Sequence, residues 1–384
     1  MISIKDLFSI LAHQETPEEM EKARLQRHLD ECWKYSLEIE NNPKNADAYN
    51  QRGWIRCTLK SYEDAEADFS KALELEPNNA AFLRNMGFLK LNSNAPAQAI
   101  EYLNASLESK PEPTALLFRG MAYSQLREFE KAAQDLETTV EIEKGLIPYL
   151  TELGETEEAE TIKNNIPFTY SQLTDVNKEL GEYEKIVENC TEWLVFKTDA
   201  LAYFRRGEAK SVLKDSKGAL ADLTEAIKLK QNLVKHCLIK AYMLRGTLKV
   251  GLDDKMGDKL GAIADFNDAM KLEPDWEDPY MLLGLIRLGT QRAIDDFSTA
   301  IKINPKKTEL YEYRGLAKVN KRRIEEAIED YTKAIELGSK RTLYCRSKAY
   351  AELGKEDLAK QDMEKYNALP PELRGDDEFL QMFK

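Results

Sequence analysis

Six arginines recur along the chain, each followed sixteen or twenty residues later by an aspartate. A planar guanidinium can hold a carboxylate through two parallel hydrogen bonds, so this spacing predicts ion pairs between facing segments. A basic row that binds a ligand is the alternative, but the matching aspartates favour an internal clasp. The six predicted pairs are Arg52–Asp68, Arg119–Asp135, Arg206–Asp222, Arg245–Asp265, Arg314–Asp330 and Arg346–Asp362.

Residues that could catalyse a reaction or hold a metal show no comparable pattern. The three histidines, His13, His28 and His236, are too few and too scattered for a metal site. The sequence contains no glycine-rich phosphate loop and no Gly-x-Ser-x-Gly nucleophile elbow. We therefore predict that the chain is not an enzyme and uses no cofactor and no metal.

The cysteines and the net charge limit the compartment and the partners. The five cysteines form no Cys-x-x-Cys pair, which is typical of small core residues in a reducing compartment. A net charge of −13 argues against nucleic acid and anionic membranes. No apolar stretch approaches the ~18 residues of a membrane span, and the N-terminus lacks a signal-peptide pattern. We predict a cytoplasmic chain that binds a protein or peptide; the oligomeric state stays open.

The arginines belong to a motif that returns about every 34 residues, the period of helix–turn–helix arrays. In most repeats a first helix carries Arg-Gly, and a second helix carries residues such as Ala65, Phe69 and Ala72 at helical spacing. Gly53 and Ala65 let the two backbones approach closely, and Phe69 fills the gap beside them. Repeats are predicted to start at Ala46, Ala80, Pro113, Ala200, Ile239, Glu277, Thr308 and Lys340.

Eight repeats in this register resemble the tetratricopeptide repeat family, most clearly over residues 46–146 and 200–366. The resemblance implies an all-α fold, a right-handed superhelical solenoid of antiparallel helix pairs. It also implies that the first helices line a concave groove, which in this family commonly binds peptides or helices.

The repeats divide the chain into five parts. We expect N-terminal capping helices in 1–45, three repeats in 46–146, an irregular stretch of degenerate repeats in 147–199, five repeats in 200–366, and a C-terminal tail or cap in 367–384. A single continuous array with altered curvature in the middle is favoured over a joint between two arrays, because the helical periodicity does not lapse.

Three local features carry further expectations. Pro148 and Pro167 should interrupt the middle stretch, and four extra residues lengthen a turn within 251–261. A helix that begins after Thr16 should pack against a helix around Leu7 and Phe8. The residues of that helix expected to be buried are Leu25, Leu29, Cys32, Trp33 and Leu37.

The resemblance further implies that the fifth and ninth residues of each repeat point into the groove. In the first three repeats the ninth residues form an apolar strip of Trp54, Phe88 and Met121, flanked by Asn50 and Arg84. Exposed apolar strips usually mark binding sites, although the N-terminal helices or neighbouring side chains could instead cover this one. The groove candidates are Asn50, Trp54, Arg84, Phe88, Leu117, Met121, Phe204 and Glu208.

Three functions are compatible with these residues. The first is a non-catalytic scaffold that binds a peptide or protein segment in the groove. The second is an architectural subunit or adaptor that assembles a larger complex through its convex face or tail. The third and weakest is a co-chaperone-like adaptor. Of the family's Lys, Asn and Arg clamp for carboxylates, Asn85 matches one element, whereas Trp54, Thr114 and Phe118 occupy other clamp positions.

Overall fold

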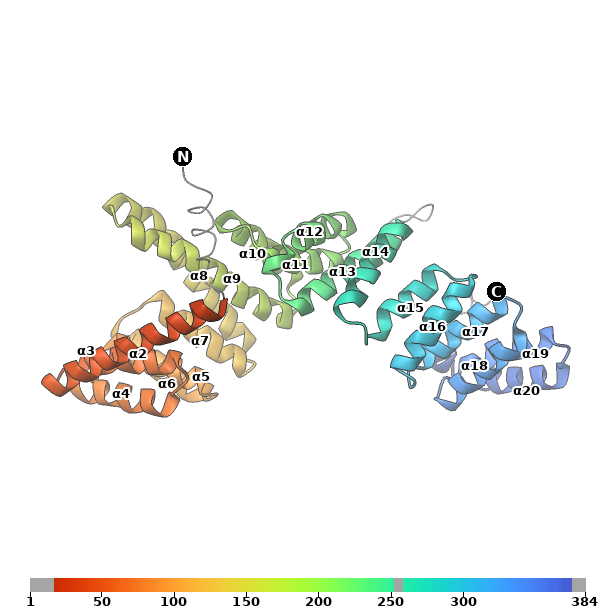
Figure 1. Ribbon diagram of the computed structural model, residues 1–384, viewed down its shortest axis with the longest axis horizontal. Helices are drawn as coiled ribbons and strands as arrows, with labels where there is room; N and C mark the ends of the chain where they lie inside the picture. The colour runs from red at the N-terminus through yellow and green to blue at the C-terminus, as the bar shows by residue number, and fades with distance from the viewer. Residues whose placement is uncertain (1–16, 252–257, 375–384) are drawn as a thin grey trace, which may run out of the picture. The chain divides into compact units, whose positions relative to one another are not determined.

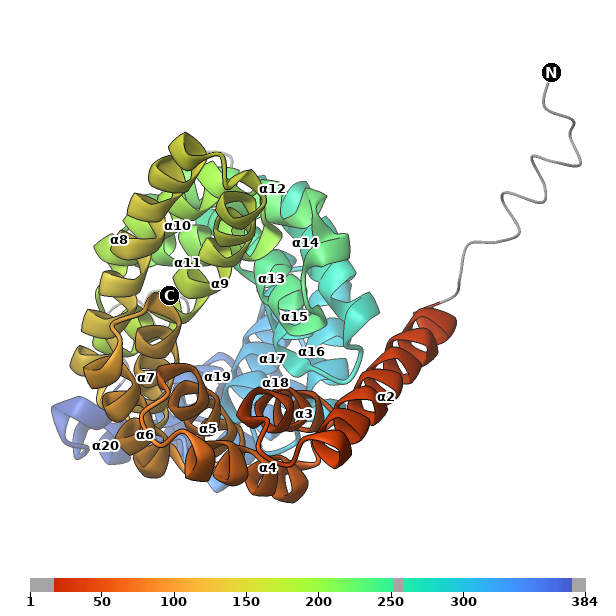
Figure 2. The same ribbon diagram turned by 90° about the vertical axis from the view of Figure 1, so that its left-hand side faces the viewer.

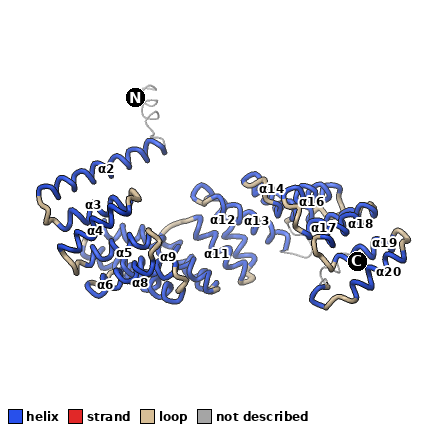
Figure 3. The backbone as a smooth tube through the Cα atoms, turned by 90° about the horizontal axis from the view of Figure 1, so that it is seen from below, coloured by secondary structure: helices blue, strands red, loops and turns tan. Residues whose placement is uncertain are grey.

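The computed structural model describes residues 17–251 and 258–374, which are almost entirely helical and contain no strand (Figures 1, 2 and 3). The chain divides between Thr198 and Asp199 into two compact units, called here the N-terminal unit and the C-terminal unit. Within each unit, consecutive helices pack as antiparallel pairs. The predicted all-α solenoid of helix pairs is thereby confirmed.

The N-terminal unit contains nine of the described helices. They are α2 (Pro17–Asn41), α3 (Ala46–Thr58), α4 (Tyr62–Leu75), α5 (Ala80–Asn92), α6 (Pro96–Ser109), α7 (Pro113–Gln125), α8 (Phe129–Leu153), α9 (Thr156–Leu180) and α10 (Tyr183–Phe196).

The C-terminal unit contains ten described α-helices and two short 3₁₀ helices, Lys230–Asn232 and Pro371–Leu373. The α-helices are α11 (Ala200–Val212), α12 (Ser216–Lys228), α13 (Lys235–Gly251), α14 (Lys259–Leu272), α15 (Glu277–Ile286), α16 (Gln291–Ile303), α17 (Thr308–Asn320), α18 (Ile324–Glu336), α19 (Thr342–Glu352) and α20 (Glu356–Asn367). No helix in the described ranges is both long and apolar enough to cross a membrane.

First helices of successive repeats lie side by side, as in the row α3, α5 and α7. Several of them begin where a polar side chain caps the free backbone N–H groups of the first turn. Asn45 accepts a hydrogen bond from the backbone of Ala48, and Asp199 accepts one from Leu201. These caps fix where α3 and α11 start.

The helix pairs pack closely where the repeat glycine meets the aromatic or leucine anchor of the second helix. A Cβ atom on Gly284 would lie 2.6 Å from Cζ of Phe297, whose side chain is fully buried. A benzene ring cannot bend away from such a contact, so the glycine is required by packing.

We expect Gly284→Ala to lower the stability of the C-terminal unit by about 1–3 kcal/mol, because the added methyl overpacks the helix pair. Gly145 in α8 is the matched control, since a Cβ there meets nothing within 4 Å. Gly145→Ala should raise stability by about 0.5–1 kcal/mol through helix propensity alone. Urea unfolding followed by circular dichroism measures both; a neutral Gly284→Ala would contradict the close packing.

The predicted interruptions at Pro148 and Pro167 are wrong. Both prolines lie inside helices, α8 and α9, which are 25 residues long each. An interior proline costs roughly 3 kcal/mol in a helix. The contact between α8 and α9 is the most extensive between any two described helices, and it offsets this cost.

The predicted burial of the first described helix is also wrong. Leu25, Leu29, Trp33 and Leu37 of α2 are exposed, and Cys32 is half-buried. Their expected partner around Leu7 and Phe8 lies outside the described residues, as do 252–257 of the long turn and 375–384 of the tail.

Candidate functional site

All six matched arginines and aspartates are in contact. In each pair the arginine Nε and Nη2 atoms donate to the two carboxylate oxygens of the aspartate, over 2.5–3.0 Å. The aspartate side chains are buried to more than nine-tenths. The hydrogen bond to Asp68 raises the pKa of Arg52, and Asp135 and Asp362 act likewise on the pKa of Arg119 and Arg346.

A second cation, which the sequence interpretation missed, shares the aspartate in four repeats. It stands four residues after the matched arginine, one helical turn along the same face. These cations are Arg56, Lys210, Lys249 and Lys318, at 2.6–2.8 Å from their aspartates. In the repeat that has Leu283 in place of the arginine, Arg287 pairs with Asp296 at 2.8 Å.

The arginines also link one repeat to the one before it. Arg314 Nη1 donates to Ser298 Oγ of α16 at 3.1 Å, and Arg346 Nη1 donates to Thr332 Oγ1 of α18 at 3.0 Å. Each such guanidinium therefore joins three helices. This geometry makes the pairs structural, because the donors point into the array and not toward a ligand.

A row of aromatic rings runs along the first helices of the N-terminal unit. The centroid of Trp54 on α3 lies 5.0 Å from that of Phe88 on α5, which lies 4.7 Å from that of Phe118 on α7. These distances are typical of attractive ring contacts. All three side chains are only partly buried, and they pack on the cores beneath the first helices. We call Trp54, Phe88 and Phe118 the aromatic row.

We predict Met121 as the third residue of this strip. In the structure the third ring of the row is Phe118, three residues before Met121 on α7. Met121 is also partly buried and packs against the same small core as Phe118. Leu117 is buried. The three-residue spacing places Phe118 and Met121 near one another on α7, and the packing of α5 and α7 brings the ring of Phe118 onto Phe88.

The polar groove candidates beside the row already bond within the protein. Asn50 is buried and accepts a hydrogen bond from Asn85 Nδ2 at 2.9 Å. Arg84 forms an ion pair with Glu112 at 2.9 Å and donates from Nε to Asn85. Each of the two side chains therefore already has a hydrogen-bond partner within the protein.

The C-terminal unit holds the two remaining candidates. Phe204 and Glu208 of α11 line a groove of about 330 Å³ together with Met243 and Thr247 of α13. Phe204 itself is buried. Lys240, which is exposed, stands at the same groove.

Comparison with known proteins finds the same repeat in both units. Residues 46–79, 86–143 and 308–338 each match the family described as tetratricopeptide repeat. A DnaJ protein P58IPK homolog B of Oryza sativa subsp. japonica is 23% identical over 267 residues, 49% of this chain and 57% of that protein. A Protein SGT1 homolog of Bos taurus is 36% identical over 63 residues, 16% of this chain and 19% of that protein.

Among solved structures, the crystal structure of MamA shares 22% identity at a TM-score of 0.41, and the match covers 47% of this chain and 96% of that one. This chain spans about half the length of the DnaJ relative that it matches. Matching repeats occur in the N-terminal unit and in the C-terminal unit alike. The chain belongs to the tetratricopeptide repeat family.

Proposed function

We propose that the chain is a non-catalytic scaffold whose N-terminal unit binds an apolar peptide or protein segment along the aromatic row. One observation carries this proposal: three partly exposed rings from three successive first helices stand in mutual contact. Aromatic side chains bring large contact area at low entropic cost, and they dominate binding hot spots.

Binding would draw on apolar burial more than on charge. The Arg84 guanidinium has five N–H donors, and its bonds to Asn85 and Glu112 use two of them. A remaining donor can hold a backbone carbonyl of the bound segment and so set its orientation. Met121 would extend the apolar contact at the α7 end.

The proposal assigns no catalytic step to the chain. The residues with the most regular chemical pattern, the arginines and aspartates, are used to hold helices together. We also propose a cytoplasmic location, which is supported by the five cysteines, none of which forms a disulfide bond in the part of the chain that the structure describes.

A co-chaperone-like adaptor has less support. Asn85 is the one residue that matches the carboxylate clamp of the family, and its amide donates to Asn50. An architectural subunit or adaptor of a larger complex is the second candidate, and the exposed apolar side chains of α2 favour it.

Phe88→Ala is expected to weaken binding of an apolar peptide by at least about thirtyfold, since the central ring contacts both neighbours. Peptides selected from a displayed random library on the wild-type chain serve as probes, and fluorescence polarisation measures their affinity. Phe168→Ala is the matched control, because Phe168 is an exposed aromatic of α9 outside the row.

A Phe88→Leu variant separates binding from folding, since leucine fills much of the volume but removes the ring. Unfolding midpoints of all variants are measured alongside. Selected peptides whose affinity is the same for wild type and Phe88→Ala would exclude the aromatic row as the binding surface.

A further inference from the structure

An apolar stripe on α2 has no partner within the described chain. Leu25, Leu29, Trp33 and Leu37 follow one another at four-residue intervals and are 46–69% exposed. The buried side of α2, which carries Ile39, packs on α3 instead. By contrast, the anchors of the other second helices, such as Phe69 of α4, are fully buried. Contiguous exposed apolar surface of this kind marks an interaction site.

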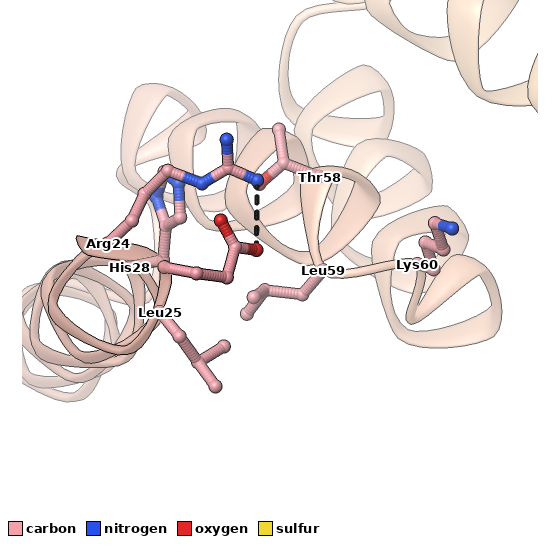
Figure 4. A pocket seen from close by; sticks show the side chains of 7 residues that line it. Arg24, Leu25, His28, Thr58, Leu59 and Lys60 are labelled. Atoms are coloured by element: carbon pink, nitrogen blue, oxygen red, sulfur yellow. Dashed lines mark hydrogen bonds and ion pairs between the residues drawn. The ribbon is translucent and has the colours of Figure 1, made fainter. Parts of the chain in front are cut away.

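The N-terminal half of α2 also packs incompletely against the neighbouring helix α3. A pocket of about 540 Å³ separates it from the end of α3, and Leu25 and His28 border this pocket opposite Leu59 (Figure 4). Figure 4 shows Leu25 directed past Leu59 and away from the α3 backbone. The described residues therefore leave the Leu25 end of the stripe partly uncovered.

Opposite charges stand at the two ends of the stripe. Lys22 lies three residues before Leu25, and Glu40 lies three residues after Leu37, so both continue the same helical face. Both side chains are exposed. In chain order, this face carries Lys22, Leu25, Leu29, Trp33, Leu37 and Glu40.

The face is complementary to itself when a second copy runs antiparallel. A twofold axis beside residue 31 sets Leu25 against the partner's Leu37, and Leu29 against the partner's Trp33. The same axis sets Lys22 against the partner's Glu40, and the reciprocal contacts follow from the symmetry. A parallel pair would instead place like charges together at each end.

We propose that α2 forms an antiparallel homodimer with α2 of a second copy of this chain, through Leu25, Leu29, Trp33 and Leu37. The four apolar side chains are removed from water, and the two lysine–glutamate pairs fix direction and register. The paired faces run from Lys22 to Glu40, about 27 Å of helix, so the interface is small beside the ~1,200–2,000 Å² of stable complexes. We therefore expect a dimer with a dissociation constant of micromolar order.

Sedimentation equilibrium of the full chain between low and high micromolar concentration tests the dimer. Wild type should pass from monomer to dimer across this range. Trp33→Glu should raise the dissociation constant at least about thirtyfold, since a buried tryptophan contributes strongly to interfaces. Leu358→Glu is the matched control, because Leu358 on α20 is 41% exposed and should leave association unchanged.

A charge exchange tests the direction of pairing. Lys22→Glu and Glu40→Lys should each weaken the dimer by about tenfold, and the double variant should restore it, because the pairs re-form with reversed sign. Arg27→Glu is the control for the change in charge, since Arg27 lies on the opposite face of α2. Circular dichroism verifies that every variant keeps its helices.

Three results would overturn the homodimer. The first is a monomer at every concentration. The second is a dimer whose dissociation constant is unchanged by Trp33→Glu, or is not restored by the double charge exchange. The third is a wild-type monomer that dimerises only when residues 1–16 are removed, which would show that this segment occupies the stripe.

Discussion

Asp330→Ala is expected to destabilise the C-terminal unit by about 3–5 kcal/mol, the loss that follows when a buried ion pair is broken on one side. The Asp330 carboxylate holds Arg314 at 2.6 Å and Lys318 at 2.8 Å. Its side chain is 5% exposed, and that of Lys318 is 9% exposed. Removing the carboxylate leaves two poorly solvated cations next to each other, and the contact of Lys318 with the more exposed Glu326, at 3.9 Å, compensates them poorly.

Urea unfolding measured by circular dichroism gives the change in the free energy of unfolding. Asp296→Ala is the matched control: Asp296 has the single partner Arg287, both side chains are more exposed, and we expect a loss of about 1 kcal/mol. Equal unfolding midpoints for wild type and Asp330→Ala would contradict a stabilising role for the ion pairs of Asp330 with Arg314 and Lys318.

One repeat shows that the clasp can be replaced as a whole. At the places of the arginine and the aspartate it carries Met86, which is buried, and Tyr102, which is partly buried. Arg119→Met combined with Asp135→Tyr should therefore retain most of the stability that Asp135→Ala loses. Replacing both members by packed apolar groups leaves no uncompensated charge.

Glu143→Gln is expected to stabilise the N-terminal unit at neutral and alkaline pH by an amount on the order of 2–3 kcal/mol. Burial raises the pKa of Glu143 from 4.5 to about 7, and a hydrogen bond from Thr169 Oγ1, at 3.1 Å, opposes this rise. Ionising the carboxyl in the folded protein takes a charge into the space between α8 and α9. Glutamine keeps the acceptor for Thr169 without that charge.

The sign of the pH dependence follows from the protonation of the two states. Below pH 4.5 the carboxyl is protonated in both the folded and the unfolded chain, so Glu143 has its full stabilising contribution there. Between pH 4.5 and about 7 the unfolded chain has released the proton while the folded chain retains it, and stability falls. Above about 7 the loss is complete.

The difference in melting temperature between wild type and Glu143→Gln should therefore be small at pH 4.5 and grow up to about pH 7. Taking this difference cancels the acid denaturation that other carboxylates cause. Glu141→Gln, an exposed position on the same helix, should show no such trend. A difference that is constant with pH would contradict the raised pKa of Glu143.

The features that depend on spacing along one helix, or between the two helices of one repeat, could be predicted from the sequence. The repeat period, the helix starts and the partners of Arg206 or Arg314 belong to this class. Antiparallel packing within a pair is dictated by a short turn and by one close contact, as between Gly53 and Phe69. Local chemistry therefore determines the geometry inside a repeat.

The tertiary structure alone decided what lies between repeats and at their edges. The contact between the rings of Phe88 and Phe118 depends on how α5 and α7 pack, which no local pattern encodes. The second cation, such as Lys318, was missed for a related reason: a lysine on a helix face is usually solvated, and only the fold brings it onto a buried carboxylate.

The same distinction explains the two corrections. Apolar spacing in α2 predicted burial, but periodicity shows which residues share a face and not whether another element covers that face. Pro148 and Pro167 predicted breaks, but packing between two long helices outweighs the local cost of a proline. The sequence thus determined the repeats and their internal clasps, because these depend on short-range spacing. Only the tertiary structure decided which faces stay open, because exposure depends on contacts between residues far apart in the chain.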